Sequence, residues 1–117
     1  MPDKRLAIDA TYLSSPLRVA IDESTSGDNT VVAGESGYTL VVYSIFVMAT
    51  DTCALIWKSG STALTGAHQL AATGGYHIES VSGILETADG EDLVLNLSAN
   101  TQVGGVITYG KHLIPTV

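Results

Sequence analysis

The sequence predicts an all-β protein, an antiparallel β-sandwich preceded by an extended N-terminal arm. Pro and Gly interrupt the chain about every 8–12 residues, and this spacing is typical of sandwiches and barrels. Between the interruptions the chain favours Val, Ile, Thr, Tyr and Leu, which suit a pleated, half-buried surface. The 117 residues correspond to one domain that can bury a core without metals or disulfides.

Ten strands are expected from this alternation of apolar segments and turns. In chain order they span residues 6–9, 17–22, 30–33, 38–49, 54–58, 69–72, 76–80, 84–87, 93–97 and 103–109.

The first 28 residues differ from the rest, and we expect an arm or edge segment there, before a sandwich domain over residues 29–117. Two polar, turn-rich stretches, SSP at 14–16 and ESTSGDN at 23–29, flank a segment that alternates only modestly. One interpretation is an arm that lies over a neighbouring molecule. The other is an irregular edge strand followed by a surface loop.

The segment YTLVVYSIFVMA, at residues 38–49, is apolar on both faces of the strand that it predicts. Its two parities carry four large side chains each: Val41, Tyr43, Ile45 and Val47 on one, and Leu40, Val42, Phe46 and Met48 on the other. Such a strand is covered on both sides. The core would cover one face, and a loop, an arm or a second subunit the other.

The Gly-rich stretch IWKSGSTALTGAHQLAATGGY, at residues 56–76, does not have the pattern of a phosphate-binding loop. In such a loop a Lys-Ser/Thr pair and a helix follow the glycines, whereas here Lys58 precedes them and strands follow. We interpret the glycines as three tight reversals of the chain. Trp57, beside this stretch, is expected to anchor either the core or an interface.

The segment DLVLNLS is the clearest single strand, because Leu93, Leu95 and Leu97 share one face. Asp89-Gly90 precedes it and is a strong hairpin signal, since Gly accepts positive φ and Asp tolerates it. We therefore expect residues 84–87 to pair with residues 93–97.

No constellation of catalytic or metal-binding residues stands out, and we expect neither an enzyme nor a cofactor. His77 and Glu79 share a strand face, but no second close pair of ligands completes a zinc site. A Gly-x-Ser-x-Gly elbow is absent from the sequence. The acidic turn does not match a calcium loop, and we interpret its carboxylates as solvated: Glu86, Asp89, Glu91 and Asp92.

Five basic against twelve acidic residues give a net charge of −7, which argues against binding nucleic acid or anionic lipid. The longest apolar stretch is shorter than the roughly 20 residues of a membrane-spanning helix. The N-terminus lacks the pattern of a signal peptide, so we expect synthesis in the cytoplasm. Cys53, the single cysteine, is expected to be a small buried residue.

Several segments together resemble small virion proteins of tailed bacteriophages. They are SGSTALTG, LAATGGY, the turn around Glu86-Thr87 and Gly90-Glu91, LVLNLSANTQVGG and ITYG, within residues 31–109. The resemblance implies a compact sandwich of jelly-roll type that acts as a capsid decoration (cement) protein or as part of a head or tail appendage.

A decoration protein would bridge subunits of the major capsid protein on the capsid exterior of a virion assembled in a bacterial host. The resemblance also implies self-association, as a trimer in preference to a dimer. The alternative is a tail, fibre or baseplate module that binds host-surface glycan, with Trp57 and the tyrosines as a stacking platform. The candidate interface residues are Leu6, Ile8, Tyr38, Val42, Phe46, Met48 and Trp57.

Overall fold

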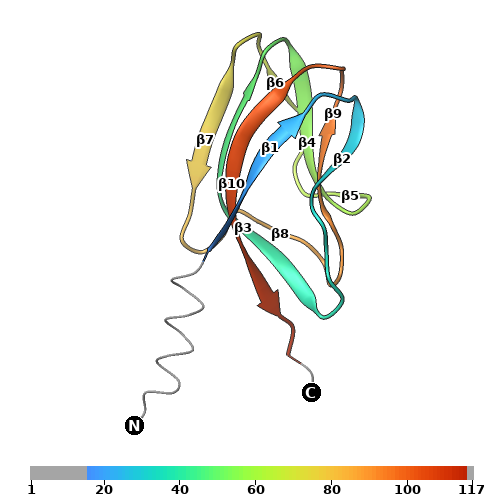
Figure 1. Cartoon of the computed structure of the whole chain (residues 1–117), viewed down its shortest axis with the longest axis vertical. Coiled ribbons are helices and arrows are strands. Elements are labelled where there is room, and N and C mark those ends of the chain that lie inside the picture. The colour runs from blue at the N-terminus through green and yellow to red at the C-terminus, as the bar shows by residue number, and fades with distance from the viewer. Residues whose placement is uncertain (1–15, 116–117) are drawn as a thin grey trace.

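The protein is described by a computed structural model that covers residues 16–115, and this part of the chain is all-β. Two antiparallel five-stranded sheets pack face to face (Figure 1), which confirms the predicted sandwich. The strands are β1 (Leu17–Glu23), β2 (Gly27–Val32), β3 (Tyr38–Ala49), β4 (Cys53–Ser59), β5 (Thr62–Ala63), β6 (His68–Leu70), β7 (Gly75–Glu79), β8 (Leu85–Glu86), β9 (Leu93–Leu97) and β10 (Val103–Leu113).

The strand order is that of a jelly roll. In one sheet, called sheet A here, the order is β1-β10-β3-β7, and β8 also pairs with β3. In the other, sheet B, the order is β2-β9-β4-β5, and β6 also pairs with β4. The pairs are nested, because β1 pairs with β10, β2 with β9, β3 with β7 and β8, and β4 with β5 and β6. A long hairpin of this kind, rolled so that alternate pairs join opposite sheets, has jelly-roll topology.

The core lies between the sheets and is formed by the side chains of the long strands that point inward. Trp57 and Leu55 of β4 face Ile45 and Val47 of β3 in one buried cluster, which Leu93, Leu95 and Leu97 of β9 complete. Cys53 is buried in the same cluster, as expected. Among residues 16–115 no helix is long and apolar enough to cross a membrane.

Residues 17–23 form part of the sandwich. β1 pairs with β10 along its whole length and is an edge strand of sheet A, and β2 already begins at Gly27. The expected boundary after residue 28 therefore falls inside a strand, and the described sandwich begins at Leu17. The expected strand at 6–9, with the interface candidates Leu6 and Ile8, lies outside the described residues.

The expected hairpin across Asp89-Gly90 is wrong. β8 pairs with β3 in sheet A, whereas β9 lies between β2 and β4 in sheet B. The turn crosses from one sheet to the other because sheet A holds its first half: Thr87 N–H donates to Leu40 O at 2.9 Å and Gly90 N–H to Tyr38 O at 3.0 Å. Gly90 does take the positive φ, 76°, that the turn prediction required.

Candidate binding surface on the outer face of sheet A

A β-bulge in β3 determines which side chains reach the outer face of sheet A. The pairing of β3 with β10 shifts register between Thr108 and Tyr109, so that Tyr43 is an extra residue on β3. Beyond such an insertion, the alternate residues that would have faced one side of the sheet face the other side. Val42 on one side of the bulge and Ile45 on the other therefore both face the core, and Tyr43 and Ser44 lie between them.

The bulge corrects the expected grouping of β3 side chains. Val42 was expected to share a face with Phe46 and Met48, but it is 0% exposed in the core. Phe46 and Met48 are 43% and 44% exposed on the outer face. Val41, which points outward before the bulge, is covered by the chain around Gly83, where an added Cβ would lie 2.7 Å from Val41 Cγ1.

The register of sheet A places a set of apolar side chains side by side beyond the bulge. Phe46 pairs with Val106 of β10, which is 39% exposed, and Val106 pairs with Ala20 of β1. Met48 lies two residues from Phe46 on the same face. We call these four residues, Ala20, Phe46, Met48 and Val106, the apolar patch. Sequence reasoning missed Ala20 and Val106, although Val106 has the opposite parity to the buried Val103 and Ile107.

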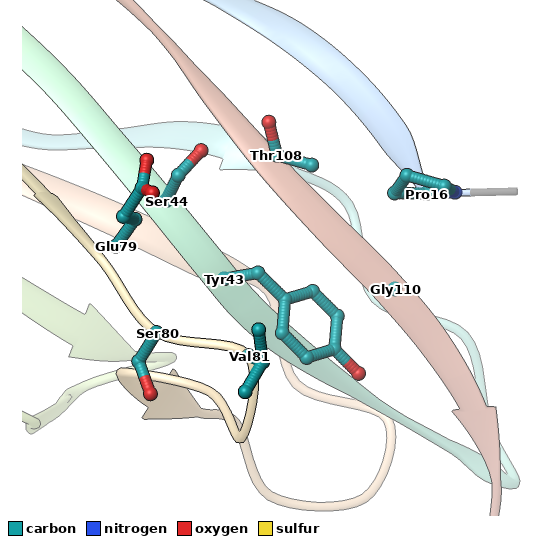
Figure 2. Close-up of a pocket in the computed structure, with 8 residues that line it drawn as sticks. All are labelled: Pro16, Tyr43, Ser44, Glu79, Ser80, Val81, Thr108 and Gly110. Carbon is teal, nitrogen blue, oxygen red and sulfur yellow. The ribbon is translucent and has the colours of Figure 1, made fainter. Parts of the chain in front are cut away.

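A cleft of about 610 Å³ adjoins the apolar patch on the other side of the bulge. Figure 2 shows that its wall comes from β3 and β10, from Pro16 just before β1, from the end of β7 and from the connection that follows β7. The residues that line it are Pro16, Tyr43, Ser44, Glu79, Ser80, Val81, Thr108 and Gly110. Sequence reasoning missed it as a site, because its residues come together only through the pairing of β3 with β7 and β10.

The bonds around Tyr43 hold the cleft in shape. Tyr43 Oη lies 2.7 Å from His112 Nε2, and Ser80 N–H donates to Tyr43 O at 2.9 Å. Gly110 makes room for the ring, because an added Cβ would lie 3.1 Å from Tyr43 Cε2 and 3.0 Å from His112 Nε2. His77 Nε2 lies 3.2 Å from Glu79 Oε1 at the rim.

Trp57 is buried in the core, where it is 1% exposed. Trp57 therefore offers no stacking surface for a glycan and no contact for a partner. Of the roles expected for it, the core anchor agrees with this burial, and the interface and glycan-stacking roles do not. Its Nε1–H donates to Tyr76 Oη at 3.0 Å, and Tyr76 Oη lies 2.9 Å from His68 Nε2. Since His68 Nδ1 lies 3.0 Å from Gly66 O, which can only accept, Nδ1 carries the proton and Tyr76 donates to Nε2.

Burial raises the pKa of the Tyr76 hydroxyl, and the hydrogen bond from Trp57 opposes this by lowering it. The hydroxyl is thus neutral near pH 7 and fills both roles, acceptor and donor. We expect Tyr76→Phe to reduce the free energy of unfolding by about 1–3 kcal/mol, because it leaves the buried Trp57 N–H without a partner. Urea denaturation followed by the fluorescence of this single tryptophan measures the loss.

Tyr109→Phe is the matched control, since within residues 16–115 the Tyr109 hydroxyl makes no hydrogen bond. Equal midpoints for the two variants would contradict the role given to Tyr76.

Tyr38 is half-buried at the other end of β3. Lys111 Nζ lies 4.7 Å from the centroid of its ring and also pairs with Glu35. The hydrogen bond to Glu35 raises the pKa of Lys111. Tyr38 thus lies away from the apolar patch and is partly covered within the chain.

The carboxylates of the acidic turn hold neighbouring loops and are not simply solvated. Asp89 Oδ1 accepts from Gly37 N–H at 2.8 Å, and Asp92 Oδ1 from Gly34 N–H at 2.7 Å. Glu91 Oε1 accepts from the buried Ser59 hydroxyl at 2.6 Å. The described residues contain no group of three or more His, Cys, Asp or Glu that could hold a metal ion.

The outer face of sheet B carries a polar network, whereas that of sheet A carries the apolar patch beside the polar side chains of the cleft. Lys58 Nζ binds both carboxylate oxygens of Asp28, at 2.9 and 3.0 Å, and Asn96 Nδ2 donates to the same carboxylate at 2.7 Å. The hydrogen bond from Asn96 and then that from Lys58 lower the pKa of Asp28. This network lies across β2, β9 and β4, so sheet A carries the face that is better suited to a partner.

Comparison of the chain with protein-family models, with curated proteins and with solved structures finds no match.

Proposed function

We propose that this protein is a structural component of a tailed-phage virion, which decorates the capsid exterior and stabilises it by bridging subunits of the major capsid protein. The observation that carries the proposal is the apolar patch, with Phe46, Met48 and Val106 exposed side by side on one sheet. Burial of such a patch is what drives most protein association. Self-association, as a trimer in preference to a dimer, belongs to the same proposal.

The patch is large enough to contribute to binding. A fully buried aromatic side chain covers about 150–250 Å², so the exposed 43% of Phe46 corresponds to roughly 60–110 Å². At about 25 cal/mol per Å², covering it contributes about 2 kcal/mol, and Met48 adds a similar amount. A lattice that binds many copies is stabilised by mass action, because the ligand binds only the assembled state.

Three further features support the proposal. The jelly-roll fold is the one that the resemblance to phage decoration proteins implies. The net charge of −7 opposes contact with DNA, so the protein suits the outer side of a DNA-filled shell. The polar network on sheet B leaves that face suited to solvent while sheet A is covered.

The experiment adds the purified protein to expanded capsids that lack it, and measures occupancy and the temperature at which the capsids open. We expect saturable binding and a higher opening temperature. Phe46→Asp and Met48→Asp should each weaken binding by about 10–100-fold, since each replaces about 2 kcal/mol of apolar burial with a charge to be desolvated.

Leu113→Asp is the control, because Leu113 is 69% exposed but pairs with Tyr38, at the far end of the sheet from the patch. Failure of the protein to bind any capsid would refute the decoration role. Equal loss for Leu113→Asp would instead refute the assignment of the contact to the patch.

A further inference from the structure

We infer that copies of this protein associate head to tail, by antiparallel pairing of β7, at one edge of sheet A, with β1, at the opposite edge of sheet A in the next copy. The inference rests on the self-association included in the proposed function and names the contact that makes it. Figure 1 shows β7 and β1 on opposite sides of the sheet, with β3 and β10 between them. Each copy thus carries one edge of each kind.

The two edges of sheet A are long and regular enough to accept another strand. An edge strand presents a row of unpaired N–H and C=O groups, which bulges or very short strands protect in many proteins. Within residues 16–115, β1 pairs with β10 over seven residues and β7 with β3 over five, both without a shift in register. In sheet B, by contrast, the pairing of β2 shifts between Thr30 and Val32, and β5 has only two residues. Sheet A therefore has the edges better suited to pairing.

The charges at the two edges are complementary in sign and in position. The register of sheet A aligns four residues in one row across its outer face, from β1 to β7: Arg18, Thr108, Ser44 and Glu79. When the next copy continues the sheet with its rows aligned, Glu79 lies directly opposite Arg18 of that copy. Opposite charges in such positions stabilise an antiparallel pair, and like charges destabilise it.

Both charged side chains are accessible to a second copy. Arg18 is exposed, and the Glu79 side chain is 72% exposed. Glu79 Oε1 lies 3.2 Å from His77 Nε2 of the same strand, which leaves Oε2 for the guanidinium group.

The same register covers the apolar side chains that the two edges expose. Ile78 pairs with the buried Ile45 and points to the same inner face of sheet A, yet it is 46% exposed because β7 is at the edge. At the other edge, Leu17 shares the face of the buried Ile21 and is 45% exposed. In the aligned register, Ile78 lies opposite Val19 of the next copy and diagonal to Leu17. The contact thus extends the core across the boundary between copies.

Pairing between like edges suits these side chains less well. Two copies of β1 that pair about Ala20 would place Leu17 opposite Glu23, an apolar side chain against a carboxylate, and would leave Ile78 uncovered. Two copies of β7 would leave the edge at β1 uncovered. A contact between unlike edges covers both, and it generates rings or open chains of copies where like edges generate a two-fold dimer. A ring of three is the closed form that agrees with the proposed function.

The first experiment measures the association of the full-length protein by sedimentation velocity at up to about 1 mM. We expect species larger than a dimer, with the trimer predominant. Arg18→Glu and Glu79→Arg should each raise the concentration at which half of the chains are associated by about tenfold, because like charges then lie opposite each other. Both substitutions in one chain should restore association, since the pair forms again with its charges exchanged. A merely structural effect of either substitution would not be relieved by the other.

A second experiment locates the contact by disulfide formation. Directly opposed Cα atoms of an antiparallel pair lie about 4.5–5.5 Å apart, within the range that a disulfide spans. A mixture of the Arg18→Cys and Glu79→Cys proteins should form a linked pair on mild oxidation, and neither protein alone should do so. The native Cys53 is buried and does not compete.

Ile78→Lys should abolish association, because a lysine at a sheet edge opposes the approach of another strand. Leu113→Lys is the matched control, since Leu113 is 69% exposed and lies on neither edge strand. Far-UV circular dichroism of both variants checks that the sheets are intact, and the exchange of charges tests the contact without a change at Ile78.

A monomer at up to about 1 mM, or a two-fold dimer, would overturn the inference. Equal loss of association in Leu113→Lys would do so too, as would nuclear Overhauser contacts that place residues 1–15 along β1 or β7. Capsid binding separates the two proposals. Head-to-tail association in a protein that binds no capsid would support this contact and refute the decoration role, and a monomer that binds and stabilises capsids would do the reverse.

Discussion

Gly105→Ala is expected to abolish the native fold or to lower the free energy of unfolding by at least about 4 kcal/mol. Gly105 lies in β10, the strand between β1 and β3, with a φ of +155°. A Cβ at this position would lie 1.9 Å from Phe46 O and 2.9 Å from Val47 Cα. Both atoms belong to the backbone of β3, so no side chain can turn away to relieve the contact. The substitution must push β10 and β3 apart.

Gly104→Ala is the matched control for this prediction. A Cβ at Gly104 would have Ile21 O, at 3.8 Å, as its nearest neighbour, which is an ordinary van der Waals contact. We expect this variant to stay within about 1 kcal/mol of the parent protein. Urea denaturation monitored by far-UV circular dichroism compares the two, and similar midpoints would contradict the close packing of β10 against β3.

The loss of stability expected for Gly105→Ala is a large part of the total, since a domain of this kind has a free energy of unfolding of about 5–15 kcal/mol. It would also remove the apolar patch and the cleft together, because both are built on the pairing of β3 with β10.

Trp57→Ala is expected to cost about 3–5 kcal/mol, the range measured for removing a large aromatic side chain from a core. Trp57 is 1% exposed and belongs to the cluster that joins β4 of sheet B to β3 of sheet A. The substitution leaves a cavity between the sheets and removes the hydrogen-bond donor to Tyr76. Circular dichroism is the appropriate measurement, because the variant has lost the chain's one tryptophan.

Trp57→Phe separates the two causes, since it keeps a ring in the core and loses the N–H group. We expect a smaller loss than for Trp57→Ala. Combined with Tyr76→Phe it should cost less than the sum of the two single substitutions, because together they remove both partners of one hydrogen bond. Additive effects would show that the bond between Trp57 and Tyr76 contributes nothing to stability.

Local patterns in the sequence predicted many of the strands well. The expected limits 38–49 and 93–97 are those of β3 and β9. These segments succeed because alternating apolar residues and flanking turn residues act over a few neighbours. The limits of other strands depend on the strands with which they pair, which are distant in the sequence. β10 continues past the expected end at residue 109 to Leu113, since Lys111, His112 and Leu113 pair with the first residues of β3.

The turn at Asp89-Gly90 shows why pairing could not be predicted in the same way. Positive φ at Gly90 suits a hairpin and equally suits a crossing between sheets. The choice depends on bonds from Thr87 and Gly90 to β3, some 50 residues away in the sequence.

The sequence by itself determined that this protein is all-β and where its turns lie. It also determined that the strand at residues 38–49 carries apolar side chains on both of its faces. Only the tertiary structure decided which of those side chains are exposed. The register of β10 against β3 forces a bulge at Tyr43, and the bulge sends Val42 into the core while Phe46 and Met48 stay outside. Register is a property of two strands far apart in the chain, so no local pattern encodes it. The apolar patch and the cleft both follow from that single extra residue.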